Sequence, residues 1–147
     1  MTIEVAVTDT QIEACFPVMR ELRPHLREDA FVEIVRELGR DGYQLAFLSD
    51  SGRVVAVAGF RFKRTLFCDR FLHVDDLVTL STERSRGYGK VLLEWLKDRA
   101  RAEGCSHLSL DSGMQRKDAH RFYQDNALPI SGYHFSVELA PRVPWSV

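Results

Sequence analysis

Hydrophobic residues along this chain recur either at every second position or at helical spacing, and stretches of the two kinds alternate along its length. Period-two alternation is typical of half-buried strands, and a spacing of three to four residues is typical of amphipathic helices. The predicted strands are 3–7, 43–48, 54–62, 71–80, 107–111 and 133–139. The predicted helices are 11–22, 29–38, 88–103 and 118–126.

Glycine and proline residues support several of these boundaries. Asp50-Ser51-Gly52 predicts a hairpin turn between two strands. Gly39 and Gly42 are expected to end the second helix. Pro17 lies inside the first helical pattern, so we expect it to kink or shorten that helix.

The resulting order, β-α-α-β-β-β-α-β-α-β, predicts a mixed α/β (α+β) fold. Consecutive hairpin strands in the first half favour antiparallel pairing, and the β-α-β unit in the second half favours one parallel pair. We expect residues 1–147 to form a single domain in which residues 140–147 are an irregular tail.

Composition narrows the classes of function. Hydrophobic residues are 45% of the chain and charged residues 28%, and the net charge is −1. A net charge near zero does not favour a polyanionic partner such as DNA. It has neither an apolar run long enough for a membrane span nor a signal-peptide pattern at its start. The expectation is a cytoplasmic protein without a nucleic-acid or membrane partner.

Cysteines are few and irregularly spaced, at Cys15, Cys68 and Cys105. Neither a Cys-x-x-Cys nor a His-x-x-x-His pair is present to hold zinc. Reduced thiols in a cytosolic protein are the expected state.

The residues with the clearest chemistry are 84–90, Arg-Ser-Arg-Gly-Tyr-Gly-Lys, between a predicted strand and a predicted helix. Glycines let the main chain approach a ligand closely, and the N-terminus of a helix attracts anions. Arg84, Arg86 and Lys90 can offset the charge of such an anion. Neither the dinucleotide pattern nor the P-loop pattern fits this spacing. The alternative is an ordinary turn with solvated arginines.

The spacing Arg84-x-x-Gly87-x-Gly89, with a strand before it and a helix after it, resembles the pyrophosphate loop of the GNAT N-acetyltransferases. The order of elements is also that of this superfamily. The resemblance implies a mostly antiparallel central sheet with helices on both faces, and acetyl-coenzyme A as co-substrate. It further implies that coenzyme A contacts Leu77, Val78, Thr79, Arg84, Ser85, Arg86, Gly87, Tyr88, Gly89 and Lys90.

A second resemblance lies in residues 116–123, Arg-Lys-Asp-Ala-His-Arg-Phe-Tyr, which are similar to the C-terminal half of aminoalkylphosphonate N-acetyltransferases. Residues 112–139 also resemble the C-terminal part of many GNAT enzymes, where Ala-His-Arg-Phe-Tyr recurs. That wider resemblance implies that Tyr123 is the general acid that protonates the departing thiolate. The departing thiolate has a parent thiol of pKa roughly 8.5, and a tyrosine of pKa near 10 stays protonated at pH 7 and can donate to that sulfur. The alternative is that the pair only packs in the hydrophobic core, as a Phe-Tyr pair on an amphipathic helix usually does.

The family pattern is not fully kept. Gly-Phe usually follows this tyrosine by four residues, and Ala127-Leu128 stands there instead, so we expect altered packing. No clear set of metal ligands is present, and no metal is expected.

Asp75 and Asp76 are adjacent within a predicted strand, where aspartate is uncommon. Alternation predicts that one carboxylate faces an acceptor cavity and the other the opposite side. Either aspartate can orient an amine or pass its proton through water. The alternative is a salt-bridged pair, with His73 as a partner.

These patterns and resemblances together predict an acetyl-coenzyme A-dependent N-acetyltransferase. It would move an acetyl group to a primary amine of a small molecule by direct attack, through a tetrahedral intermediate. A protein or peptide N-acetyltransferase, and a non-catalytic coenzyme A sensor on the same fold, remain alternatives. A homodimer that pairs through the exposed C-terminal strand is compatible with the family. The identity of the amine and the choice of base stay open.

Overall fold

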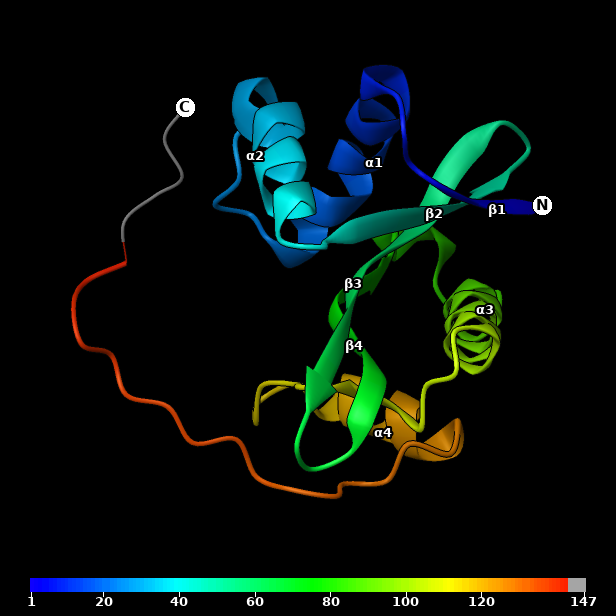
Figure 1. The fold of residues 1–147 in the computed structure, drawn as a ribbon. Coiled ribbons are helices and arrows are strands. Elements are labelled where there is room, and N and C mark those ends of the chain that lie inside the picture. The colour runs from blue at the N-terminus through cyan, green and yellow to red at the C-terminus, as the bar shows by residue number, and fades with distance from the viewer. Residues whose placement is uncertain (143–147) are drawn as a thin grey trace.

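The computed structural model describes residues 1–142 and contains one five-stranded sheet flanked by helices (Figure 1). Its elements in chain order are β1 (Thr2–Val5), α1 (Asp9–Leu22), α2 (Glu28–Arg40), β2 (Gln44–Asp50), β3 (Arg53–Thr65), β4 (Asp69–Thr79), the 3-10 helix η1 (Ser81–Glu83), α3 (Tyr88–Ala102), β5 (His107–Leu110) and α4 (Lys117–Asp125). The strands lie side by side in the order β1-β2-β3-β4-β5. Only the β4–β5 pair is parallel, which confirms the predicted mixed and mostly antiparallel sheet.

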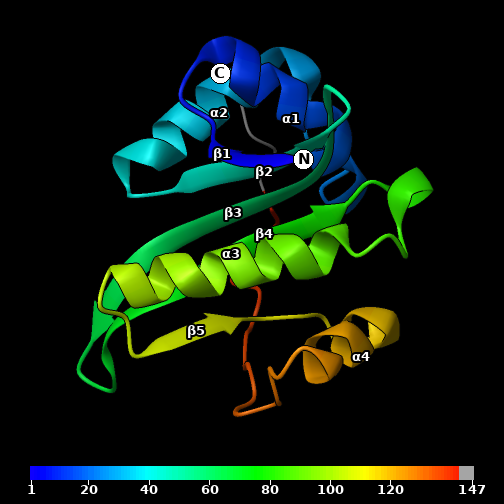
Figure 2. The ribbon, with the colours of Figure 1, turned by 90° about the vertical axis from the view of Figure 1, so that its right-hand side faces the viewer.

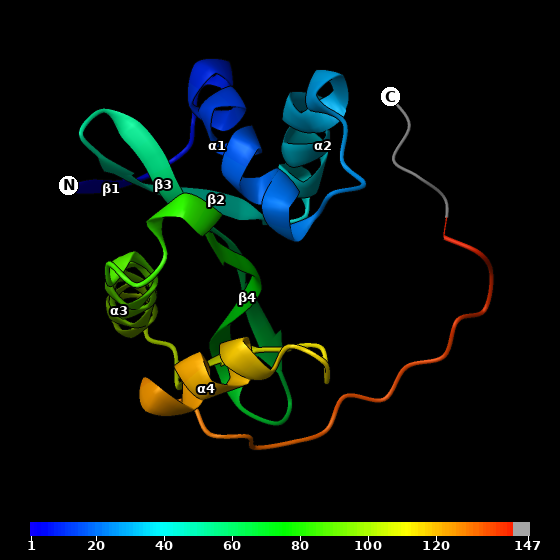
Figure 3. The same cartoon turned by 180° about the vertical axis from the view of Figure 1, so that it is seen from behind.

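Helices cover both faces of the sheet, with α1 and α2 on one face and α3 on the other (Figures 1 and 3). Alternation along β2 explains both layers. Leu45 and Phe47 pack with the buried side chains of α1 and α2, whereas Ala46 and Leu48 pack with those of α3. Because both faces are covered, the centre of β2 is buried at successive positions. No helix of residues 1–142 is both long and apolar enough to cross a membrane.

Helix α1 begins earlier than expected and is not shortened by its proline. Thr8 caps the helix, and the side chain of Gln11 accepts the main-chain N–H groups of Val7 and Thr8. Because the main chain of Val7 already bonds to this cap, β1 ends at Val5 and Val7 is outside the strand. Pro17 lies on the exposed face of α1, above Glu13, whose carbonyl loses its helical donor there but can bond water. The helix therefore continues to Leu22.

Two turns show how glycine acts in this chain. Ser51 and Gly52 both have left-handed φ values, of 53° and 76°, which confirms the predicted tight hairpin between β2 and β3. Helix α2 instead passes through Gly39 and ends at Arg40, so the expectation that Gly39 stops it is wrong. Gly42, with a φ of 91°, makes the turn into β2.

A β-bulge in β4 positions the site. Gly59 of β3 pairs with Asp76, but the next residue, Phe60, pairs with Val74, so Asp75 is the extra residue. On its other side β4 pairs with β5 only from Phe71 to Val74. From Asp75 to Thr79, that edge of β4 has no strand beside it within residues 1–142. The two strands part here, and Figure 2 shows β5 ending while β4 continues toward α3.

The predicted strand 133–139 is wrong for the single chain. Residues after α4 run away from the body as an extended segment (Figure 1). Side chains of Tyr133, Phe135, Val137 and Leu139 are between 78% and 93% exposed. Alternating residues form a strand only when they pair with the edge of another strand, and this segment pairs with no strand of residues 1–142. Of the predicted tail, residues 140–142 are irregular and residues 143–147 lie outside the described part.

Candidate functional site

The loop before α3 has the backbone geometry of an anion cradle. Ser85 and Gly87 have left-handed φ values of 68° and 84°. The first helical hydrogen bond is donated by the Val91 N–H to the Gly87 carbonyl, at 3.0 Å. The N–H groups of residues 88–90 consequently have no acceptor in the helix. They point out of its N-terminus, which carries the partial positive charge of the helix dipole. A diphosphate is a suitable ligand for such converging donors.

The cations of this loop differ in their availability. Arg86 forms an ion pair with Glu83, with 3.2 Å from its Nε to Oε2, and Glu83 also binds Arg53 at 3.2 Å. Arg84 and Lys90 are exposed and form no ion pair with any of residues 1–142. Arg84 and Lys90 are therefore the free charges beside the cradle.

Tyr88 contributes its main chain to this loop, while its side chain points inward. The buried ring packs in the α3 core, and its hydroxyl donates to Asp50 of the β2–β3 turn at 2.5 Å. That hydrogen bond raises the pKa of Tyr88 and lowers the pKa of Asp50. The side chain thus anchors the start of α3 to the hairpin.

Gly89 is the point at which three parts of the site meet. A Cβ atom at this position would lie 3.4 Å from Oγ1 of Thr79 and 3.3 Å from Cζ of Phe122. The start of α3, the end of β4 and helix α4 are therefore in contact. The side chain of Val78 is buried among α1 and α2, so this residue can border the opening only with its main chain.

Tyr123 lies on α4 next to Phe122, with the two rings 5.6 Å apart in an edge-to-face arrangement. Partial burial raises the pKa of Tyr123 above the ordinary tyrosine value, and the nearby Arg116 opposes this rise. The phenol is protonated at neutral pH, as a general acid requires.

The departure at residues 127–128 leaves the turn after α4 intact. Ala127 has a φ of 65°, a conformation that glycine adopts without strain and alanine adopts at a cost of roughly 1–2 kcal/mol. The Leu128 N–H donates to the Tyr123 carbonyl at 2.9 Å, which closes the helix end.

Ser112 follows β5 at the opening between β4 and β5. Its hydroxyl oxygen is buried and has no hydrogen-bond partner within residues 1–142. A buried hydroxyl without a partner is uncommon and is a candidate ligand contact.

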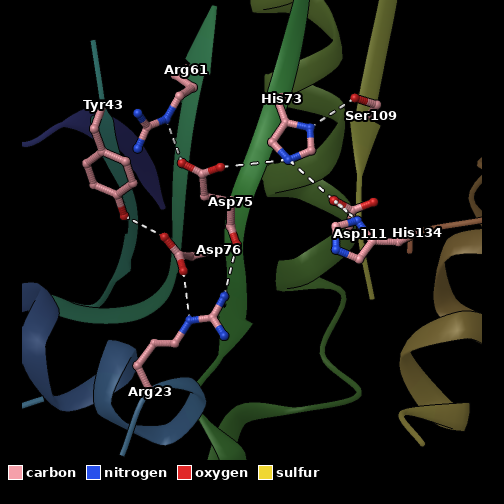
Figure 4. A network of polar contacts seen from close by, with 9 residues as sticks. All are labelled: Arg23, Tyr43, Arg61, His73, Asp75, Asp76, Ser109, Asp111 and His134. Atoms are coloured by element: carbon pink, nitrogen blue, oxygen red, sulfur yellow. Dashed lines mark hydrogen bonds and ion pairs between the residues drawn. The ribbon is translucent and has the colours of Figure 1, made fainter. Parts of the chain in front are cut away.

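Asp76 is held by two side chains from other elements. Its Oδ1 lies 2.9 Å from Nε of Arg23, and its Oδ2 accepts the hydroxyl of Tyr43 at 2.7 Å (Figure 4). The carboxylate is 14% exposed and the guanidinium 41% exposed. Burial, followed by the charge of Asp76, raises the pKa of Tyr43 well above its ordinary value.

Asp75 forms a separate but neighbouring set of contacts. Its Oδ2 lies 2.8 Å from Nε of Arg61, and its Oδ1 lies 3.8 Å from Nε2 of His73. Its carbonyl accepts Nη2 of Arg23 at 3.0 Å, which joins the two sets into one network (Figure 4). Burial, as the largest influence, lowers the pKa of His73. The salt-bridge alternative for these aspartates is thus present in the structure, with Arg61 and Arg23 as the charged partners and His73 as a neighbour of Asp75.

The expectation that Asp75 and Asp76 face opposite sides is wrong. Arg61 and Tyr43 are in contact, with the guanidinium 5.5 Å from the ring centroid, so the partners of both carboxylates lie on the α1–α2 side of the sheet. The bulge is the cause, because an extra residue interrupts the alternation of side chains at this point.

A cavity of about 230 Å³ adjoins Asp76. Apolar side chains of α1 and α2 form most of its wall, and Arg23, His25, Tyr43 and Asp76 form its polar part. The side chain of Asp75 is not part of this wall. No group of three or more His, Cys, Asp or Glu residues within 1–142 is arranged to hold a metal ion.

The sequence interpretation missed the partners of the carboxylates, Arg23, Tyr43 and Arg61. Arg23 lies 53 positions from Asp76 along the chain, and no local pattern indicates that they meet. Alternation along β3 does place Arg61 and Gly59 on the same face, which was the one available indication.

Comparison with known proteins adds family relationships to this geometry. The model of the acetyltransferase (GNAT) family matches residues 9–127. An uncharacterised N-acetyltransferase of Bacillus subtilis (strain 168), YhdJ, is 37% identical over 122 residues, which cover 82% of this chain and 86% of that protein. An aminoalkylphosphonate N-acetyltransferase of Salmonella typhimurium is 30% identical over 98 residues, covering 66% of this chain and 62% of the relative.

Solved structures share the fold. A transcriptional regulator from Bacillus halodurans C-125 superposes with a TM-score of 0.82 at 23% identity, covering 94% of this chain and 99% of that one. The overall arrangement of strands and helices is therefore one that has been observed experimentally.

Proposed function

This chain belongs to the GNAT family of acetyltransferases, and we propose that it transfers the acetyl group of acetyl-coenzyme A to a primary amine of a small molecule. The observation that carries the proposal is the opening between β4 and β5, which has free main-chain donors of α3 at one end and Tyr123 on the adjacent helix.

The co-substrate fits this opening in two parts. The diphosphate would accept hydrogen bonds from the N–H groups of residues 88–90, with Arg84 and Lys90 offsetting its charge. The pantetheine arm would lie along Leu77, Val78 and Thr79 and pair with the unoccupied edge of β4. The Ser112 hydroxyl is a further donor for this arm.

The acceptor site is assigned to the cavity beside Asp76. A volume of about 230 Å³ with apolar walls suits a compact amine better than a peptide segment. Asp76 lines the cavity, so we assign it the role of orienting the amine and taking its proton through water. Asp75, held by Arg61 and His73 outside the cavity, is assigned a positioning role.

The reaction then follows from the placement of these groups. The neutral amine nitrogen attacks the thioester carbonyl carbon and forms a tetrahedral intermediate. Main-chain N–H groups of the open edge of β4 stabilise its oxyanion. The carbon–sulfur bond breaks, the thiolate takes the proton of Tyr123, and the excess proton on nitrogen passes to Asp76. Asp76 then releases this proton to bulk water, and bulk water returns one to Tyr123, so no proton is gained or lost overall.

A thiol-release assay with a panel of amines tests this function. The panel contains aminophosphonates, polyamines, amino acids and peptides; aminophosphonates are included because of the Salmonella relative. We expect turnover with at least one small amine. The Tyr123→Phe variant should then lose about 100-fold or more in kcat with its Kd for acetyl-coenzyme A unchanged, because only the acid is removed.

Tyr133→Phe is the matched control, since this tyrosine is exposed and far along the C-terminal segment, and its kcat should equal that of the wild type. Binding of acetyl-coenzyme A without turnover of any amine would favour a non-catalytic sensor. No binding at millimolar concentration, measured by calorimetry, would remove the basis of the proposal.

A further inference from the structure

The cavity beside Asp76 has charges of both signs in its polar wall. Nε of Arg23 lies 2.9 Å from Oδ1 of Asp76, and both side chains line the cavity. All the lining residues belong to 1–142, and Asp76 is the one carboxylate among them. A pair of opposite charges is complemented by a ligand that carries the same two charges in reverse order. The wall therefore favours a ligand with one ammonium and one anionic group.

Both members of this ion pair can take up a further partner. Arg23 donates from Nε to Asp76 and from Nη2 to the Asp75 carbonyl, and its Nη1 has no acceptor in the described part of the chain (Figure 4). Its guanidinium is 41% exposed, and the exposed His25 is a second nitrogen donor in the same wall. Asp76 accepts from Arg23 and Tyr43 and keeps a second lone pair on each oxygen. An anion can thus bind to Arg23 while an ammonium binds to Asp76.

The closeness of the two charges indicates which anion fits. In an α-amino acid the ammonium and the carboxylate are attached to the same carbon, so they can contact two groups as close together as those of Arg23 and Asp76. A diamine would instead place its second cation beside Arg23, and like charges repel at this distance. A phosphonate can carry two negative charges, and the one guanidinium that would face it is already shared with Asp76. A carboxylate carries a single charge and matches the planar guanidinium.

The rest of the wall is apolar and comes from α1, α2 and the connection between them. The side chains that contribute are Met19, Leu26, Phe31, Ile34, Val35 and Leu38. Because the first, third and fourth of these are almost fully buried, the half-buried Leu26, Val35 and Leu38 present most of the apolar surface to a ligand. The volume of about 230 Å³ is below the roughly 300–1,000 Å³ typical of sites for drug-sized ligands. A small molecule with one apolar substituent fits such a space.

We propose that the acceptor is an α-amino acid with an apolar side chain. Its amine binds Asp76, its carboxylate binds Arg23 and His25, and its side chain lies against the apolar wall formed by α1 and α2. This acceptor class rests on the proposed acetyl-transfer function and narrows it from small amines in general.

The nitrogen of such a zwitterion loses two protons in the reaction. The first passes through water to Asp76 and on to bulk water, which leaves the neutral amine that attacks the thioester. The second leaves after the nitrogen–carbon bond has formed, and the thiolate released by breaking the carbon–sulfur bond takes one proton from Tyr123. The products are an N-acetyl amino acid, the free thiol and one proton in solution.

L-Leucine and L-leucinamide form a matched pair of substrates that differ only in the carboxylate. The ammonium of leucinamide has the lower pKa, because no carboxylate stabilises it, so more of this amine is neutral at pH 7. Without recognition of the carboxylate, leucinamide would therefore react faster. We expect kcat/KM in the thiol-release assay to be at least about 10-fold higher for L-leucine, because the amide loses a hydrogen bond between charged groups. Equal values, or a preference for leucinamide, would overturn the proposal.

A series of straight-chain amino acids tests the apolar wall. From alanine through 2-aminobutyrate to norvaline, kcat/KM should rise by about 10-fold per methylene, the contribution of one methylene in an apolar pocket. Putrescine, which carries a second cation, and 2-aminoethylphosphonate should both be poorer substrates than L-leucine. A higher kcat/KM for either of them would overturn the proposal.

Arg23→Gln removes the cation assigned to the carboxylate. Because the lost contact to Asp76 affects every amine, the informative quantity is the ratio of kcat/KM between L-leucine and L-leucinamide. This ratio should fall at least about 10-fold in Arg23→Gln, whereas Arg23→Lys should keep part of it, since lysine retains the charge. An unchanged ratio in Arg23→Gln would overturn the assignment of the carboxylate.

The apolar wall has a matched pair of its own in α2. Leu38 and Val32 are both half-buried and packed against the core between the sheet and helices α1 and α2, but only Leu38 lines the cavity. Leu38→Ala enlarges the space, so the ratio of kcat/KM between norleucine and norvaline should rise about 10-fold. Val32→Ala should leave this ratio unchanged. No shift in Leu38→Ala, or an equal shift in both variants, would overturn the placement of the side chain.

Calorimetry on the protein saturated with coenzyme A separates this acceptor class from the proposed function, since binding does not require turnover. L-Leucine should bind at least about 10-fold more tightly than L-leucinamide. If other amines are acetylated but L-leucine does not bind, acetyl transfer stands and the acceptor class is wrong. If L-leucine binds but no amine is acetylated, the ligand of the cavity stands and the acetyl-transfer function is wrong.

Discussion

At the scale of single residues, the network around Asp75 and Asp76 distinguishes two adjacent carboxylates. Both lie on the α1–α2 side of the sheet, but only Asp76 borders the cavity. Asp76 accepts hydrogen bonds from the guanidinium of Arg23 and the hydroxyl of Tyr43. Asp75 accepts one from the guanidinium of Arg61 and lies near His73. Each oxygen of Asp76 keeps a second lone pair, so an amine or a water can still bind there.

Replacing these carboxylates separately tests the assignment of the base. We expect Asp76→Asn to lower kcat/KM for the amine by about 100-fold, the usual contribution of a general base, with the Kd of acetyl-coenzyme A unchanged. Asp75→Asn is the matched control and should cost less than about 10-fold. Steady-state kinetics and calorimetry measure both quantities. A larger loss in Asp75→Asn than in Asp76→Asn would reverse the two roles.

At the scale of elements, the site depends on how α3 begins. Left-handed residues in the loop precede the helix, whose first N–H groups have no acceptor within it, and the second residue of the helix is a glycine in contact with β4 and α4. A side chain at position 89 would push against Thr79 and Phe122 and fill the space in front of the free donors. The backbone itself tolerates a side chain there, because Gly89 has no left-handed φ.

The Gly89→Leu variant separates binding from folding. We expect its Kd for acetyl-coenzyme A to rise at least 10-fold, while its melting temperature changes by only a few degrees, because leucine gains nearly 1 kcal/mol of helix propensity over glycine. Gly39→Ala is the control: it lies in α2 with no atom within 4 Å of its Cβ position, and should stabilise the protein by roughly 0.5–1 kcal/mol without affecting binding. An unfolded Gly89→Leu protein, or one with unchanged affinity, would contradict this account.

At the scale of the whole molecule, stability rests on two cores separated by the sheet. The α1–α2 core contains Cys15, which is fully buried and donates its thiol to the Gln11 carbonyl at 3.3 Å. Burial raises the pKa of Cys15 from 9.0 to about 12. The folded state therefore keeps the thiol proton at a pH where the unfolded chain loses it, so stability falls as pH rises above about 9.

This linkage predicts an alkaline loss of stability that one substitution removes. Between pH 8 and pH 10, the free energy of unfolding of the wild type should fall by roughly 1–1.5 kcal/mol more than that of Cys15→Ala. Urea unfolding under reducing conditions measures the difference. Cys68→Ala, at the β3–β4 hairpin, is the control and should keep the wild-type slope. Parallel pH profiles for the wild type and Cys15→Ala would refute the linkage.

Local patterns predicted most of the elements and the central loop. The order of strands and helices and the β2–β3 hairpin follow from hydrophobic period and turn residues, which act over a few positions. The helices on both faces were expected from the family resemblance. The predictions that proved wrong concern residues whose structure depends on their surroundings in the folded chain. Pro17 is tolerated because it lies on the exposed face of α1, and the segment 133–139 is not a strand because no edge lies beside it in a single chain.

The sequence by itself determined the fold class, the glycine loop at the start of α3 and the position of Tyr123 on α4, because each depends on residues that are neighbours along the chain. Only the tertiary structure decided that Asp75 and Asp76 share one face and have different partners. A bulge of one residue reverses the direction in which the following side chains of a strand point. Whether β4 forms such a bulge depends on its pairing with β3 and on the contact with Arg23 at the end of α1. The cavity beside Asp76 likewise exists only once those elements are assembled.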